Sequence, residues 1–248
     1  MLRSYADTVS RPAEITVIDN GSSDNTRCVI DKARNFLPTL QAIFLDENIG
    51  GEALNACLDN VRGDLIHITE NDQLFLSGWT DHARDAFKIF SDLGQLSFFA
   101  PVPTDEQAWE VQPCHLRFSQ GKILYEAHHN LTTSSVIRSN LIRDHNIRIH
   151  NLPSSGTMQF KFPDDGRLSR DVKNAGYWCA WSDRYYVRNL GHEIAEFARD
   201  RPYYEENYAS KPWLGIEGWK RRLTAARGRP RIHRHSLVFA KSAGIILP

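Results

Sequence analysis

Apolar runs alternate with turn-and-helix patterns through the first hundred residues, and this alternation constrains the fold more than any other feature. Strand-like runs at 14–19, 40–45, 65–68 and 95–100 are separated by segments with helical character at about 26–36, 52–61 and 78–93. Strands that alternate with helices favour a parallel sheet with right-handed crossover connections. The sequence therefore predicts an α/β domain with a mainly parallel twisted sheet flanked by helices.

The pattern is less regular after residue 100. Residues 101–130 predict irregular structure, because they contain three prolines and no clear periodicity. Later segments predict a strand at 131–137, a helix at 166–174, and short strands at 177–181 and 185–187. We expect one domain over residues 1–192, followed by a helical, basic extension over residues 193–248.

Composition excludes several classes of protein. The 248 residues carry 30 Lys plus Arg and 30 Asp plus Glu, so no overall field favours nucleic acid as a partner. No run reaches the ~18 apolar residues of a membrane span, and the N-terminus does not resemble a signal peptide. The four cysteines form no C-x-x-C pair, which argues against zinc and is typical of a cytoplasmic protein.

The strand at 65–68 ends in the acidic cluster Glu70-Asn71-Asp72. The carboxyl ends of strands are where open α/β sheets bind ligands, and carboxylates two residues apart can reach one hard cation and the group beside it. The cluster therefore indicates a divalent metal held against a diphosphate. A solvated acidic loop is the alternative interpretation.

Two polar turns follow the first two strands. Asp19 precedes a turn rich in Asn, Gly and Ser, where its carboxylate could accept a hydrogen bond from a base or ribose, or simply form a turn. Gly50 and Gly51 open the next helical segment, where backbone N–H groups could approach an anion, or where the pair could make an ordinary tight turn.

A second acidic pair, Asp164-Asp165, opens the predicted helix at 166–174. A carboxylate there could serve as general base toward a sugar hydroxyl, although acidic residues are also common in a first helical turn. His192 follows the last predicted strand, where a neutral imidazole could complete a metal shell with Asp72 or be a structural histidine.

Together these segments resemble the family-2 glycosyltransferases, which have a GT-A fold. Val17–Thr26 is similar to the family's V-D-D-G-S-T-D-x-T, and Asn48–Asn55 to its N-x-G-x-x-x-A-x-N. Gly63–Asp72 is similar to the strand with the D-x-D signature, Asp164–Leu168 to E-D-x-x-L, and Gly191-His192 to a later histidine. Several motifs in the same order are more specific than any one of them.

The resemblance implies a role for each residue. Asp19 contacts the nucleoside base, Glu70 lies near the ribose or donor sugar, and Asp72 binds Mn²⁺ or Mg²⁺ with His192 as a further ligand. Asp165 acts as the catalytic base, and Asp164 orients the acceptor or Asp165. The remaining members of the predicted nucleotide site are Asn20, Gly50, Gly51 and Asn71.

The implied activity is inverting transfer of a sugar from a nucleotide-diphosphate sugar to an acceptor hydroxyl. Residues 1–100 would form the nucleotide-binding half and residues 101–192 the acceptor half. We expect a carbohydrate or lipid-linked acceptor and a cytoplasmic location. The basic extension either contacts the inner face of the membrane or is a solvated face. A nucleotide-sugar or carbohydrate-binding protein with little turnover is the alternative, and a nucleotidyltransferase is less favoured because no Gly-rich, basic phosphate loop follows the first strand.

The sequence departs from the family at three places. Glu70 replaces the first Asp of D-x-D, and Asp164 replaces a Glu, so either acidic residue of the pair could be the base. The family's opening strand is missing, because Leu2, Tyr5, Ala6 and Val9 already have helical spacing. Either the chain starts downstream of the natural start or another segment fills that place in the sheet. On this basis we expect weak activity and poor solubility.

Overall fold

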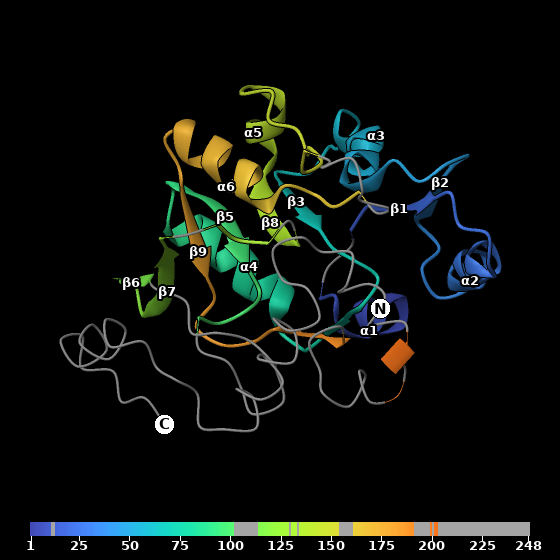
Figure 1. Ribbon diagram of the computed structural model, residues 1–248. Coiled ribbons are helices and arrows are strands. Elements are labelled where there is room, and N and C mark those ends of the chain that lie inside the picture. Colours follow the sequence, from blue (N-terminus) through green and yellow to red (C-terminus); the bar gives the residue numbers. More distant parts are fainter. Residues whose placement is uncertain are drawn as a thin grey trace.

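The computed structural model describes residues 1–10, 13–101, 114–128, 130–132, 134–153 and 161–190, together with residues 199, 201 and 202. Its helices are α1 (Leu2–Thr8), α2 (Thr26–Ala33), the 3-10 helix η1 (Gly50–Leu54), α3 (Asn55–Leu58), α4 (Trp79–Ile89), α5 (Ser139–Arg143) and α6 (Asp165–Asn174). Its strands are β1 (Ile15–Asn20), β2 (Leu40–Leu45), β3 (Leu65–Ile68), β4 (Gln73–Phe75), β5 (Leu93–Ser97), β6 (Cys114–Ser119), β7 (Lys122–Ala127), β8 (Ser135–Arg138), β9 (Trp178–Trp181) and β10 (Val187–Asn189). The predicted α/β fold with helices flanking a central sheet is confirmed (Figure 1).

A small unit formed by β1, α2 and β2 lies at one end of the molecule (Figure 1). β1 and β2 pair in parallel, in register from Ile15 opposite Leu40 to Asn20 opposite Leu45. The intervening helix α2 buries Ile30 and Ala33 against Leu37 and Leu40. The unit is the strand–helix–strand crossover that the alternating pattern predicts.

The main sheet has six strands in the order β3-β8-β5-β9-β7-β6. Its strands β3, β5 and β9 run in the same direction, because β3 and β5 are both antiparallel to β8 and β5 is parallel to β9. The sheet is nevertheless mixed rather than mainly parallel. β8 enters between β3 and β5 from the opposite direction, and β7 and β6 add two further antiparallel ladders.

Two expectations about local structure were wrong. Residues 114–127 form the β6–β7 hairpin within the stretch expected to be irregular, with Phe118 opposite Ile123. Its turn has positive φ at Gln120 (48°) and Gly121 (77°), which matches the twist of a tight hairpin. The helix expected over 52–61 is the short pair η1 and α3, because the turn at Gly50-Gly51 is itself drawn into the 3-10 helix.

β1 and β3 each have one strand partner among the described residues, namely β2 and β8, so the two sheets are not joined by a ladder. Helix α1 packs across this break between β1 and β3: Leu2 and Ala6 contact the small core, whereas Tyr5 contacts the large one. The Tyr5 ring stacks on His67 of β3 with ring centroids 6.3 Å apart.

No helix within the described ranges is both long enough and apolar enough to cross a membrane.

Candidate functional site

Asp19, near the end of β1, is held by hydrogen bonding although it is only 2 % exposed. Its Oδ1 accepts a hydrogen bond from the Ser22 N–H at 3.0 Å, and its Oδ2 lies 3.5 Å from Nε of Arg27. The hydrogen bonding from Ser22, followed by the Arg27 guanidinium, holds the pKa of Asp19 below its usual range. The carboxylate is therefore an ionised acceptor at the end of the strand.

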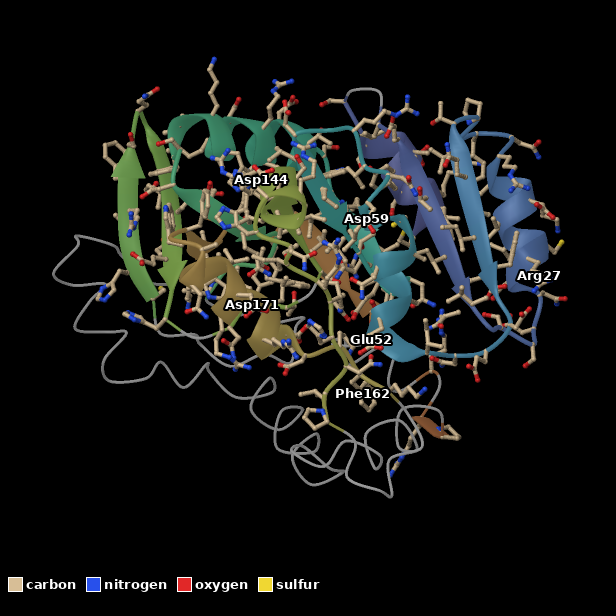
Figure 2. The ribbon with its side chains drawn as sticks, turned by 90° about the horizontal axis from the view of Figure 1, so that it is seen from above. Arg27, Glu52, Asp59, Asp144, Phe162 and Asp171 are labelled. Carbon is tan, nitrogen blue, oxygen red and sulfur yellow. The ribbon has the colours of Figure 1, made fainter. Side chains whose placement is uncertain are left out.

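Arg27 was not predicted as part of this site, although the sequence carries a signal for it. It lies in the first turn of α2, where a cation opposes the helix dipole and so needs another partner. The guanidinium lies over the Phe44 ring at 4.8 Å and beside Asp19. Arg27 sits at the outer end of the β1–β2 unit (Figure 2).

Hydrogen bonds from the Asn20 side chain connect the end of β1 to the turn that precedes η1. Its Nδ2 donates to Asn48 Oδ1 and to the Gly50 carbonyl, both at 3.0 Å, and its Oδ1 accepts from the Ile49 N–H at 2.9 Å. Three hydrogen bonds from one amide fix this turn beside Asp19. The predicted base-binding and diphosphate-binding segments are thus joined directly.

Gly50 and Gly51 are glycines because the chain at 161–163 lies against them. A Cβ on Gly50, whose φ is +74°, would collide with Cβ of Lys161 and lie 2.6 Å from Oδ1 of Asn151. A Cβ on Gly51 would lie 2.6 Å from Cβ of Pro163. The close approach is therefore between two parts of the protein, and binding of a diphosphate by these glycines stays a prediction.

Asn151 completes this contact, and nothing in the sequence singled it out. Its Nδ2 donates to the Ile49 carbonyl at 2.9 Å, and its backbone forms an isolated bridge with Pro163. Its N–H donates to Glu52 Oε1 at 3.3 Å, and Glu52 and Phe162 lie at the same edge of the molecule (Figure 2). Residue 151 thereby connects the 48–51 turn to the segment that enters α6.

Asp164 and Asp165 differ in what they do at the start of α6. Asp164 is the N-cap: its Oδ1 accepts from the Arg167 N–H at 2.8 Å, and its Oδ2 lies 3.9 Å from the Arg170 guanidinium. Its side chain is 15 % exposed. Asp165 is the first residue of the helix proper. Capping engages Asp164, and the role of Asp165 as the proton acceptor of the pair stays a prediction.

The acidic cluster at 70–72 lies between β3 and β4. β4 pairs antiparallel with β10, and the Leu190 N–H donates to the Asp72 carbonyl at 2.8 Å. The chain therefore returns beside Asp72 two residues before His192. His192 and all of the basic extension except residues 199, 201 and 202 lie outside the described residues. Within the described ranges, no three His, Cys, Asp or Glu side chains gather as a metal site.

The structure thus brings the predicted residues together in two sets. Asp19, Asn20, Gly50 and Gly51 are linked through Asn151 and Pro163 to the segment that carries Asp164 and Asp165. Asp72 is linked to residue 190 in the other set. The first set joins a strand end, a glycine turn and a capped helix that bears two carboxylates.

Residues 2–89 match the family model described as Glycosyl transferase family 2. The matched span includes the turns after β1 and β2 and the acidic cluster at 70–72, and it ends before Asp164. The resemblance drawn from the motifs is therefore confirmed over this part of the chain. No curated protein matches the sequence.

Solved structures of TarS from S. aureus share the fold. TarS 1–349 in complex with UDP-GlcNAc has a TM-score of 0.52 and 19% identity, covering 75% of this chain and 52% of that one. TarS 1–349 alone has a TM-score of 0.54 and 16% identity, with coverage of 98% and 68%. The complex with UDP has a TM-score of 0.51 and 17% identity, with coverage of 100% and 71%. This chain spans about half the length of the first of these structures, and the likeness confirms a GT-A-like fold.

Proposed function

We propose that this protein is a glycosyltransferase that moves a sugar from a nucleotide-diphosphate sugar to an acceptor hydroxyl with inversion. The observation that carries the proposal is the contact between the Gly50-Gly51 turn and residues 161–163. This contact brings the segment tied to Asp19 and Asn20 against the segment that leads into Asp165. The family match over residues 2–89 and the fold of TarS support the same class.

In this proposal each side chain has a defined task. Asp19 accepts a hydrogen bond from the nucleoside base, and the acceptor hydroxyl binds beside Asp165. As the hydroxyl oxygen forms a bond to the anomeric carbon, the bond from that carbon to the diphosphate oxygen breaks. The hydroxyl proton passes to the Asp165 carboxylate, and a nucleoside diphosphate leaves. Attack from the face opposite the leaving group inverts the anomeric centre.

The residue types at the end of β3, two carboxylates and an amide, are ones that bind Mn²⁺ or Mg²⁺. These ions prefer oxygen ligands and are commonly held by one or two carboxylates together with substrate phosphates. Asp72 would supply the carboxylate, with Glu70 and Asn71 beside the donor and His192 as a further ligand. When bound, the ion neutralises charge that develops on the departing diphosphate. The metal, the carbohydrate or lipid-linked acceptor, and contact of the basic extension with a membrane remain predictions.

A nucleotide-sugar-binding protein with little turnover is the second candidate. The break between β1 and β3 favours it, because the strand edges beside the predicted donor site have no ladder partner among the described residues. Unpaired edges make a less rigid support, and catalysis needs closer positioning than binding does.

A donor panel with Mn²⁺ separates the two candidates. UDP-GlcNAc, the ligand in one TarS structure, is the first donor to test, beside GDP- and ADP-linked sugars. Binding is read by thermal shift, since a ligand of the folded state raises its stability, and turnover by release of nucleoside diphosphate. Asp72→Ala should abolish the Mn²⁺-dependent part of the shift, whereas Asp165→Asn should keep the shift and stop release. A donor-induced shift without release in the wild type would favour the binding protein, and no shift with any donor would refute both.

A further inference from the structure

A buried polar network ties α6 to the main sheet. Its three side chains, Gln95 of β5, Ser135 of β8 and Ser169 of α6, have 0% exposure. The Ser169 hydroxyl donates to Gln95 Oε1 at 3.0 Å, and Gln95 Nε2 donates to Ser135 Oγ at 2.8 Å. The Leu131 N–H donates to Ser169 Oγ at 2.9 Å. Four segments of the chain therefore meet at one cluster of hydrogen bonds.

The polar atoms of Gln95 and Ser169, at the centre of the network, all have hydrogen-bond partners, and this makes the network rigid. Both ends of the Gln95 amide are used, since its Nε2 also donates to the Thr132 carbonyl at 3.3 Å. Ser169 acts as donor and as acceptor at once. A buried polar group costs free energy unless it is hydrogen-bonded, so each member depends on the others staying in place.

The network lies between the two acidic motifs of the proposed site. Ser169 is four residues after Asp165, and residues four apart lie on the same face of a helix. Ser135 is the ladder partner of Ile68, the last residue of β3, which leads into Glu70 and Asp72. The chain of contacts runs from the helix of the carboxylate pair, through Gln95, to the strand of the acidic cluster.

We propose that Ser169 and Gln95 are positioning residues that fix the first turn of α6, and with it Asp165, relative to the end of β3. The proposal rests on the proposed function, because it concerns the placement of the same carboxylate. Misplacement of a catalytic group by about 1 Å can cost on the order of a hundredfold in rate. Ser169→Ala leaves the Gln95 amide without its partner on α6, so the helix loses its polar attachment to β5.

The test compares Ser169→Ala with Ser182→Ala. Ser182 is also 0% exposed, and its hydroxyl donates to the Ser97 carbonyl at 2.6 Å beside His82, with no bond to α6. Amide hydrogen exchange over residues 164–174 should rise about tenfold or more in Ser169→Ala and stay unchanged in Ser182→Ala. Ser135→Ala, which removes the acceptor of Gln95 Nε2 and leaves the bond from Ser169 to Gln95 in place, should give a smaller rise.

Turnover gives the second readout. With UDP-GlcNAc, Mn²⁺ and water as acceptor, Ser169→Ala should lower kcat about tenfold or more while KM stays within about twofold. Ser182→Ala should change neither constant. Unchanged exchange in Ser169→Ala and Ser135→Ala, or an equal rise in Ser182→Ala, overturns the positioning proposal. Hydrogen exchange does not depend on turnover. If the variants show the expected exchange pattern but the wild type hydrolyses no donor, the proposed function is refuted and the positioning role of the network is not.

Discussion

The β1–β2 unit and the six-stranded sheet both carry sequence motifs, but they differ greatly in the size of their buried cores. The first has a buried cluster of Ile30, Ala33, Leu37 and Leu40. The second has a far larger core that includes residues of β3, β5, β8 and β9 and of α4 and α6. The motifs at Asp19 and Gly50 lie beside the smaller core, so the residues that sequence motifs single out there are not the residues that make up the main core.

Two small contacts join the β1–β2 unit to the main sheet. Helix α1 contacts both cores, and the Gly50-Gly51 turn contacts residues 161–163. Segments with few buried contacts open at lower free energy than the rest of a protein. We therefore expect the β1–β2 unit to open before the main sheet does.

Leucine truncations in each core give the largest expected effect. Leu96→Ala, at a position with 0% exposure in the main core, should lower the free energy of unfolding by about 3–5 kcal/mol, because the site cannot collapse around the cavity. Leu40→Ala in the small core should cost less, about 2 kcal/mol, and should speed hydrogen exchange only over residues 15–45. Denaturant unfolding and exchange by segment measure both. Faster exchange throughout the chain in Leu40→Ala would contradict the division into two regions.

A matched pair of glycines tests the contact between the regions. Gly50 and Gly121 have φ values of +74° and +77°, but only Gly50 has neighbours within 4 Å of an added Cβ. Alanine at either position costs about 1–2 kcal/mol in backbone strain, and Gly50→Ala should cost about 1–3 kcal/mol more because 161–163 must move.

Thermal unfolding of the two glycine variants measures the difference, and donor-induced shifts show its effect on the site. Gly50→Ala should weaken donor binding, whereas Gly121→Ala in the β6–β7 turn should leave it unchanged. Equal losses of stability in the two variants would mean that residues 161–163 can move away from the added methyl group without a measurable loss of folding free energy.

The sequence was sufficient for β1, α2, β2, β3, α4 and β5, because turns that contain Gly, Asn or Ser follow β1, β2 and β3, but it did not reveal the short strand β4. It was also sufficient for the helix at 165–174, whose cap and first turn are acidic. It did not reveal the β6–β7 hairpin, where Gln120 rather than Asn takes the first positive φ of the turn. The mixed order of the sheet was equally hidden, since the residues of β8 pair with residues of β3 and β5 that are forty or more positions away.

For the site, local motifs indicated the residues at strand ends and helix starts, but not the residues that join them. Asn151 is a single Asn in a loop, and its contact with the Ile49 carbonyl depends on tertiary structure. Gln95 and Ser169 lie 74 residues apart, and neither stands out in an apolar strand or a polar helix. Long-range hydrogen bonds of this kind leave no periodic pattern in a single sequence.

His67 of β3, at the seam beside α1, gives a pH-dependent test of the comparison. Both ring nitrogens are buried and have no hydrogen-bond partner in the part of the chain that the structure describes, and burial lowers the pKa of His67 to about 3. The folded state therefore favours neutral His67, and the stability this provides is present above the unfolded pKa of about 6.5 and is lost as pH falls toward 3.

His67→Phe should thus become more stable than the wild type as pH falls, by up to about 2 kcal/mol at about pH 5. Thermal unfolding between about pH 7 and pH 5 measures the difference, with exposed His145→Asn as the control that should follow the wild type. If the melting temperatures of His67→Phe and the wild type fell in parallel with pH, protonation of His67 would cost no stability. The break between β1 and β3 would then open to admit the charged ring.

The smallest expected effect separates the two carboxylates of α6, which belongs to the well-packed region. Asp164→Ala removes the cap on the Arg167 N–H and should cost about 1 kcal/mol of stability, whereas Asp164→Asn keeps an acceptor oxygen and should cost only a few tenths. Because a capping role needs an oxygen but no charge, Asp164→Asn should also retain most donor hydrolysis, unlike Asp165→Asn. If Asp164→Asn abolished hydrolysis and Asp165→Asn retained it, Asp164 would be the base. The N-cap residue of α6 would then itself accept the proton.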